Sequence, residues 1–95
     1  MAEHVVSPRA EADIDGIWDY TAEQWGPDRA DRYVRDIWQA IERVAADPRR
    51  GRPIAIRSGY RKYSVGAHVI FFRLLADGID VVRVLHQRMD FERHL

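Results

Sequence analysis

Residues 68–90 have the sequence HVIFFRLLADGIDVVRVLHQRMD, and this stretch decides the fold. It holds two almost wholly apolar runs, His68 to Leu75 and Ile79 to Gln87, on either side of Ala76-Asp77-Gly78. Such runs are typical of strands that are buried on both faces. Asp-Gly between them is a strong hairpin signal, and strands joined so closely pair antiparallel. The stretch therefore predicts the centre of an antiparallel sheet.

Two more strands are predicted upstream. Residues 60–65 alternate loosely and end at the turn signal Gly66-Ala67. Residues 3–7 contain His4-Val5-Val6, a short strand that we expect to pair beside the others, because an isolated strand is not stable.

Between these strands, the spacing of apolar residues predicts two amphipathic helices. Ser7-Pro8 is a favourable start for the first helix, and Gly26-Pro27 ends it. The second helix begins at Asp28 and stops at Asp47-Pro48. A break of about two residues predicts an antiparallel helical hairpin.

The predicted fold class is α+β, with the order β-α-α-β-β-β. The helical hairpin is expected to pack on one face of a twisted, mainly antiparallel sheet. The chain length of 95 residues predicts a single domain, residues 1–95. Residues 48–58 are predicted to be irregular, and residues 90–95 are predicted to form one terminal helical turn.

The chain has no cysteine, which excludes disulfides and thiolate chemistry and suits a reducing cytoplasm. No secretory signal is visible, and no apolar stretch approaches the roughly 18 residues that span a membrane. We therefore expect a cytoplasmic protein without a membrane partner.

The charge is divided unequally along the chain. Residues 1–47 contain 11 acidic and 5 basic residues, a net charge of −6, whereas residues 48–95 contain 4 acidic and 10 basic residues, a net charge of +6. The two halves either steer charged partners or simply attract one another as acidic helices and a basic sheet. Both explanations stay open.

Several kinds of site lack support. The histidines have no paired ligand spacing, so no metal or other cofactor is predicted. No serine stands in a nucleophile motif, and no glycine loop cradles a phosphate. The carboxylates of the first helix are expected to be solvated, and they are Glu11, Asp13, Asp15 and Asp19.

Basic residues gather on elements that should be neighbours in the sheet: Arg57, Arg61, Lys62, Arg73, Arg83, His86 and Arg88. Arginine and histidine together can stabilise a phosphorane-like transition state and move protons, which is RNA-cleavage chemistry without a metal. For Arg83, inside a run of valines, pairing with a helix acid is favoured instead. For His86 and Arg88 either role is open.

The residues resemble the ParE branch of the RelE/ParE toxin superfamily over essentially the whole chain. The resemblance is carried by Ser7-Pro8-Arg9-Ala10 with Asp13-Ile14 and Ile17-Trp18, by HVIFFR at 68–73, and by VLHQRMD at 84–90. It implies the toxin of a type II toxin–antitoxin pair, held in a hetero-oligomer and neutralised by a ParD-type antitoxin. Direct nucleic-acid contact is expected only through the antitoxin.

The superfamily has two kinds of target, and a shared fold does not choose between them. ParE toxins poison DNA gyrase, whereas RelE toxins cut mRNA on the ribosome and tend to carry an arginine early in the third strand. Here Val69 holds that place, and the tail has Phe91 but no tyrosine.

The leading hypothesis is therefore a non-enzymatic gyrase inhibitor that contacts its target through Arg57, Arg61, Arg73, Arg83, His86 and Arg88. The alternative is a metal-independent, ribosome-dependent mRNA endoribonuclease that uses His86, Arg88, Arg61 and Lys62. A third possibility is a binding module that has lost its toxicity.

The antitoxin is expected to bind apolar surface of the helical hairpin as an amphipathic helix or an added strand. The candidate contacts are Trp18, Trp25, Tyr33, Ile37 and Trp38. Trp25 and Trp38 are the stronger ones, because large aromatic residues anchor interfaces and these two lie off the main apolar stripes or at a helix end. For Trp18, burial in the core is the default.

Overall fold

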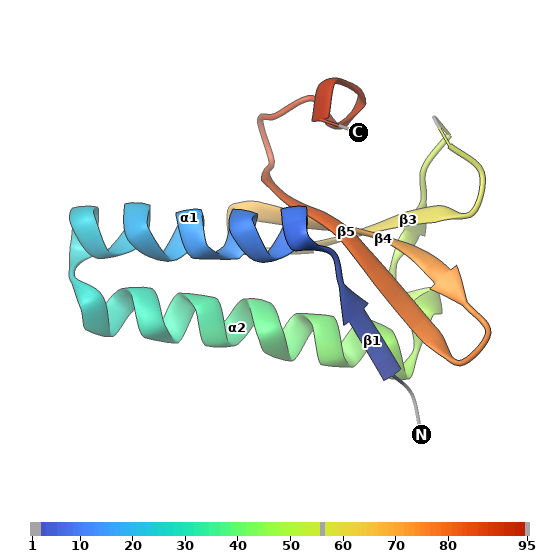
Figure 1. Ribbon diagram of the computed structural model, residues 1–95, viewed down its shortest axis with the longest axis horizontal. Coiled ribbons are helices and arrows are strands. Elements are labelled where there is room, and N and C mark those ends of the chain that lie inside the picture. Colours follow the sequence, from blue (N-terminus) through green and yellow to red (C-terminus); the bar gives the residue numbers. More distant parts are fainter. Residues whose placement is uncertain (1–2, 56, 95) are drawn as a thin grey trace.

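The computed structural model describes residues 3–55 and 57–94, and it contains one five-stranded sheet and a helical hairpin (Figure 1). The helices are α1 (Pro8–Trp25) and α2 (Pro27–Ala46). The strands are β1 (Glu3–Val6), β2 (Arg52–Pro53), β3 (Tyr60–Val65), β4 (His68–Leu75) and β5 (Gly78–His86). Short 3-10 turns, η1 and η2, follow α2 at Pro48–Arg50 and close the described chain at Phe91–His94.

The α+β prediction is confirmed, because β3, β4 and β5 form an antiparallel meander and the hairpin packs on the sheet. β1 pairs beside the meander as expected, parallel to β5, so the strand order is β1-β5-β4-β3-β2. The predicted terminal turn is η2; the last residue of that prediction lies outside the described chain.

The sheet has a fifth, short strand that the predicted order lacks, and it lies in residues 48–58, which were predicted to be irregular. Arg52 and Pro53 form β2 and pair antiparallel with Lys62 and Arg61 of β3. The pairing continues through Ile54, whose N–H donates to the carbonyl of Tyr60 at 3.0 Å. Two residues are too few to show the alternation that indicates a strand, so only the partner strand reveals this one.

The junction between β1 and α1 is tied to β5. Ser7 caps α1 as predicted, because its hydroxyl oxygen accepts from the N–H of Ala10 at 3.1 Å. The same hydroxyl donates to the carbonyl of Val82 at 2.9 Å, and the N–H of Ser7 donates to the carbonyl of Val81. These bonds fix where the first helix starts over the sheet.

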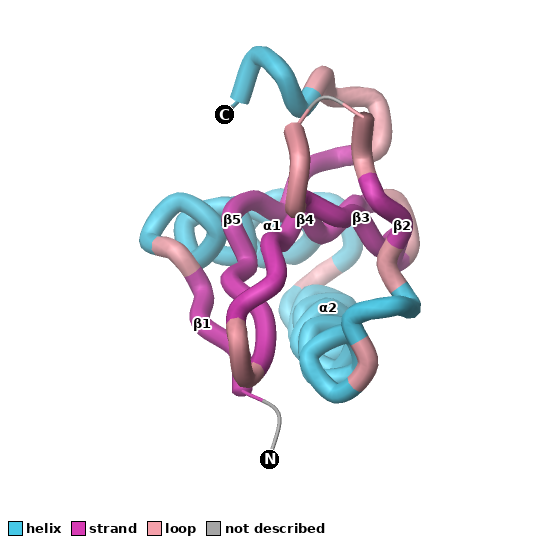
Figure 2. Tube along the Cα trace, turned by 90° about the vertical axis from the view of Figure 1, so that its right-hand side faces the viewer, coloured by secondary structure: helices cyan, strands magenta, loops and turns pink. Residues whose placement is uncertain are grey.

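The main core lies between the hairpin and the sheet. Its fully buried side chains are Ile37, Ile41, Val44, Ile70, Phe72, Ile79, Val81 and Val84. A smaller cluster on the opposite face contains Phe71, Leu85 and Phe91, with the rings of Phe71 and Phe91 stacked at 3.9 Å. Figure 2 shows η2 and α2 on opposite sides of the sheet. The 3-10 turn η2 thus covers apolar surface of the sheet that the helical hairpin does not contact.

Asp13 was expected to be solvated, and this is wrong. β1 ends at Val6, which leaves the edge of β5 open beyond Val81. Asp13 fills this gap, since its carboxylate accepts from the N–H of Val84 at 3.0 Å and from two nitrogens of Arg83 at 2.8 Å. The carboxylate thus gives the backbone N–H of Val84 a hydrogen-bond partner. Without it, this N–H would be buried and unpaired, which costs free energy.

Arg83 connects three elements. Besides its two bonds to Asp13 of α1, its guanidinium donates to the carbonyl of His94 in η2 at 2.7 Å. The hydrogen bond and charge of Asp13 raise the pKa of Arg83 above its usual value. The favoured interpretation, pairing with a helix acid, is confirmed, and the guanidinium of Arg83 makes its hydrogen bonds within the fold.

Candidate partner-binding groove

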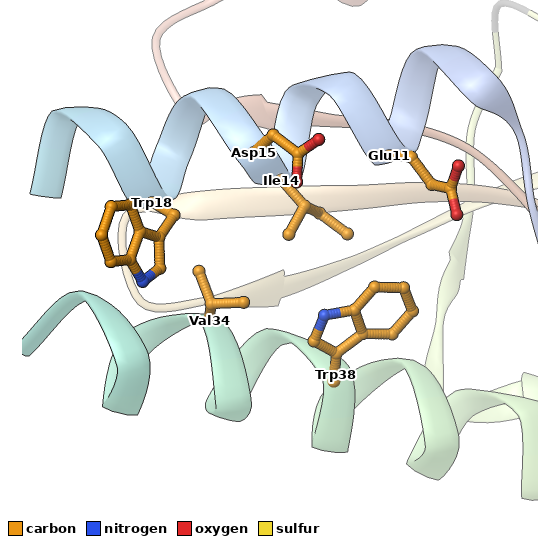
Figure 3. Close-up of a pocket in the computed structure, with 6 residues that line it drawn as sticks. All are labelled: Glu11, Ile14, Asp15, Trp18, Val34 and Trp38. Carbon is orange, nitrogen blue, oxygen red and sulfur yellow. The ribbon is translucent and has the colours of Figure 1, made fainter. Parts of the chain in front are cut away.

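A groove of about 310 Å³ runs between α1 and α2 (Figure 3). Ile14 and Trp18 of α1 face Val34 and Trp38 of α2 across it. Helical spacing explains the arrangement, because residues four apart stack on one face of a helix. Glu11 and Asp15, one turn apart on α1, complete the lining.

The two tryptophans of the groove are half-buried and held in place. The indole N–H of Trp18 donates to a carboxylate oxygen of Asp31 at 2.8 Å, which fixes its ring across the hairpin. Trp38 packs against the main core on one side, and its ring centroid lies 6.2 Å from that of His4. Aromatic side chains that are already held in one conformation suit an interface, because they lose little conformational entropy when a partner binds.

The other residues predicted to contact the antitoxin lie elsewhere. Ile37 is fully buried beneath the groove, so it has no surface with which to touch a partner. Trp25 lies at the end of α1, 56% exposed, against Tyr20 and with the guanidinium of Arg29 5.4 Å from its ring centroid. The structure therefore brings together only Trp18 and Trp38 of the predicted set.

Tyr33, the fifth candidate, points to the end of the sheet. Its hydroxyl oxygen lies 2.6 Å from Nδ1 of His68 and accepts from the N–H of Ala67 at 3.0 Å. Burial raises the pKa of Tyr33, so the phenol keeps its proton. The His86 ring stands edge-on to His68 with centroids 5.4 Å apart, and its Nδ1 accepts from the N–H of Arg88. The cross-strand pair of His68 and His86 has no signature in sequence spacing.

The neutral form of His68 is favoured in the folded state. Burial, followed by the neighbouring His86, lowers the pKa of His68 below its ordinary value. The unfolded chain then binds more protons below about pH 6.5, so the free energy of unfolding should fall as pH drops from there through the folded pKa. Urea melts of wild type and His68→Gln at several pH values test this prediction, and an unchanged slope in the variant would contradict it.

The basic residues of the sheet do not form one site. Arg61 and Lys62 are neighbours in β3, so they point to opposite faces of the sheet. Arg61 lies opposite Phe72 of the main core and donates to the carbonyl of Gly51 at 2.9 Å, whereas Lys62 lies opposite Phe71 on the other face. The four residues of the nuclease alternative therefore do not share one site, because Lys62 and His86 line one pocket and Arg61 is on the other face of the sheet.

The remaining candidates for target contact are scattered. Arg73 pairs with Asp80 across the sheet at 2.8 Å, and the guanidinium of Arg57 lies 5.5 Å from the ring centroid of Tyr60. Arg88 is exposed in the turn after β5. Across residues 3–55 and 57–94, no three His, Asp or Glu side chains lie close enough to hold a metal ion. In the same residues, no helix is both long and apolar enough to cross a membrane.

The fold has a counterpart among solved structures. A chain described as "Chromosomal ParDE TA system from P. aeruginosa" superposes with a TM-score of 0.81, at 24% identity, over 90% of this chain and 96% of that one. This likeness defines the architectural class, that of a helical hairpin packed on a mainly antiparallel sheet.

Sequence comparison goes further than the fold. Residues 5–91 match the family described as "ParE toxin of type II toxin-antitoxin system, parDE". Toxin ParE1 of Mycobacterium tuberculosis is 51% identical over 99% of this chain and 98% of its own length. Toxin ParE1 of Caulobacter vibrioides is 40% identical over 100% and 99%. The chain belongs to the ParE toxin family of type II toxin–antitoxin systems, which confirms the resemblance seen in the residues.

Proposed function

We propose that this ParE-family toxin inhibits DNA gyrase in the cytoplasm by binding it, and that a ParD-type antitoxin neutralises it. The proposal rests on membership of the ParE family, whose branch of the superfamily is directed at gyrase. Its main structural support is the separation of Arg61 and Lys62 on opposite faces of the sheet, so that Arg61 lies apart from the pocket that Lys62 and His86 line together.

The target test compares two assays on the purified toxin. We expect added toxin to block supercoiling by gyrase or to trap cleaved DNA, while transcripts in a translation extract stay intact. Full supercoiling at high toxin concentration would contradict the proposal. Codon-positioned cuts in the transcripts would instead support the endoribonuclease.

The groove between α1 and α2 is the proposed site for the antitoxin. Trp18, Val34 and Trp38 offer apolar surface that the fold leaves half-covered, on a rigid pair of helices. An amphipathic helix laid between two helices would bury this surface. Trp25, at the tip of the hairpin, extends the same helical layer and is a second anchor in the proposal.

Trp38→Ala should weaken the complex more than it destabilises the fold. Because part of the half-buried indole faces the groove, truncation removes contact area for the antitoxin. We expect the affinity to fall by at least about tenfold. Calorimetric titration with antitoxin measures this effect, and a thermal melt of the free toxin measures the cost to the fold. Equal antitoxin affinity would refute the prediction. Tyr20→Ala is the matched aromatic truncation, since Tyr20 is exposed on α1 and lies outside the groove lining, and it should keep the wild-type affinity.

A further inference from the structure

The groove between α1 and α2 carries negative charge along its sides. Glu11 and Asp15 are exposed and line it from α1 (Figure 3). A third carboxylate, Asp31, lies on α2 at the Trp18 end, where it accepts the indole hydrogen bond. The apolar surface of the groove is thus flanked by acids contributed by both helices.

These carboxylates are not neutralised within the described chain. Residues 10–28 contain six acidic residues and no basic one. Within residues 3–55 and 57–94, Glu11, Asp15 and Asp31 take part in no salt bridge. Arg35 follows Asp31 by four residues on α2, and the ring of His4 lies beside Trp38. The lining of the groove includes two carboxylates and no arginine or lysine, so the groove is net negative.

This charge restricts what can cover the tryptophans. A purely apolar or acidic segment would strip water from Glu11 and Asp15 without replacing it, which costs free energy. Basic side chains beside the apolar contact would pair with them instead. Because residues 48–76 contain seven basic residues and no acidic one, an acidic segment would be drawn to that part of the chain and repelled from the groove.

We propose that the groove binds a cationic amphipathic helix, whose apolar ridge covers Trp18, Val34 and Trp38 while Arg or Lys side chains pair with Glu11 and Asp15. This inference rests on the proposed function, since the helix belongs to the antitoxin. The seven-residue separation of Glu11 and Trp18 corresponds to about 10 Å along α1, so the occupant makes contact over two to three turns. Its apolar residues follow the spacing i, i+3 or i+4, and i+7.

The test compares two helical peptides of about 16 residues, roughly four turns, that share the same apolar positions and lack tryptophan. One carries Lys and Arg beside the apolar ridge, and the other carries Glu at the same places. The fluorescence of Trp18 and Trp38 reports binding. We expect the cationic peptide to bind at least about tenfold more tightly and to lose affinity as salt is raised. Equal affinity for the two peptides would overturn the proposal.

A pair of matched variants locates the effect. Glu11→Gln with Asp15→Asn removes two charges beside the groove, and Glu23→Gln with Asp36→Asn removes two exposed charges outside its lining. The first variant should lose most of the preference for the cationic peptide, whereas the second should keep it. Equal losses in both variants would mean that net charge, not the groove, attracts the peptide, and would overturn the proposal.

The outcomes separate this inference from the proposed function. The groove variant should still inhibit supercoiling but need more antitoxin for neutralisation. If it inhibits supercoiling and is neutralised at the wild-type antitoxin concentration, the charge inference fails and the proposed function stands. If wild-type toxin leaves supercoiling untouched while the peptide preference is present, the gyrase proposal fails and the cationic occupant stands.

Discussion

Arg83→Met is expected to lower the free energy of unfolding by about 3 kcal/mol, because it leaves a buried carboxylate without its partner. The side chains of Arg83 and Asp13 are only 16% and 14% exposed, and the pair has two bonds at 2.8 Å. The change also removes the bond from Arg83 to the carbonyl of His94, so η2 loses its anchor. Urea melts followed by circular dichroism measure the loss.

A second arginine provides the control. Arg73 also pairs with an aspartate at 2.8 Å, Asp80 on the neighbouring strand, but its side chain is half-exposed. Water screens such a pair, so Arg73→Met should change stability far less than Arg83→Met. The double variant Asp13→Asn with Arg83→Met should cost less than the sum of the single changes, because they share one interaction. Equal effects of Arg73→Met and Arg83→Met would show that burial of the pair is unimportant.

Gly51→Ala is expected to destabilise the fold by about 2 to 3 kcal/mol through overpacking. A Cβ added at buried Gly51 would lie 2.4 Å from Cζ of Phe72 and 3.2 Å from the carbonyl oxygen of Lys62. Phe72 is fully buried in the main core and cannot swing away, so the chain between η1 and β2 would have to move. Thermal unfolding of the variant measures the cost.

The matched control is Gly16→Ala in α1. An added Cβ there meets nothing within 4 Å, and alanine favours a helix by about 0.5 to 1 kcal/mol over glycine. This variant should therefore be more stable than wild type, while Gly51→Ala should be less stable. Wild-type stability in Gly51→Ala would contradict the prediction, because it would mean that the backbone around Phe72 relaxes without cost.

Elements with a strong periodic pattern were predicted correctly from the sequence. The hairpin of β4 and β5 follows from Asp77-Gly78 between two apolar runs, and the start of α1 follows from Ser7-Pro8. β2 was missed because its two residues form a strand only where β3 offers a partner. Local signals are thus sufficient for elements that bury many residues and insufficient for those that depend on a neighbour.

The residues predicted to contact the antitoxin do not lie together in the folded protein. Trp18 and Trp38 meet in the groove, Trp25 lies at the hairpin tip, and Ile37 and Tyr33 turn toward the core and the sheet. Composition identifies aromatic residues in excess of what a two-helix face needs. Which side of each helix faces the sheet depends on the crossing of two helices, which no single helix specifies.

The sequence by itself determined the α+β class, the family and the division of charge, because these depend on patterns within segments and on residues present or absent along the chain. Only the tertiary structure decided that Asp13 closes the edge of β5 with Arg83, 70 positions away. It also decided that Glu11 and Asp15 stand beside two tryptophans. The contacts of Asp13 with Arg83 and of α1 with Trp38 join residues far apart in sequence, and their energies depend on burial that only packing creates.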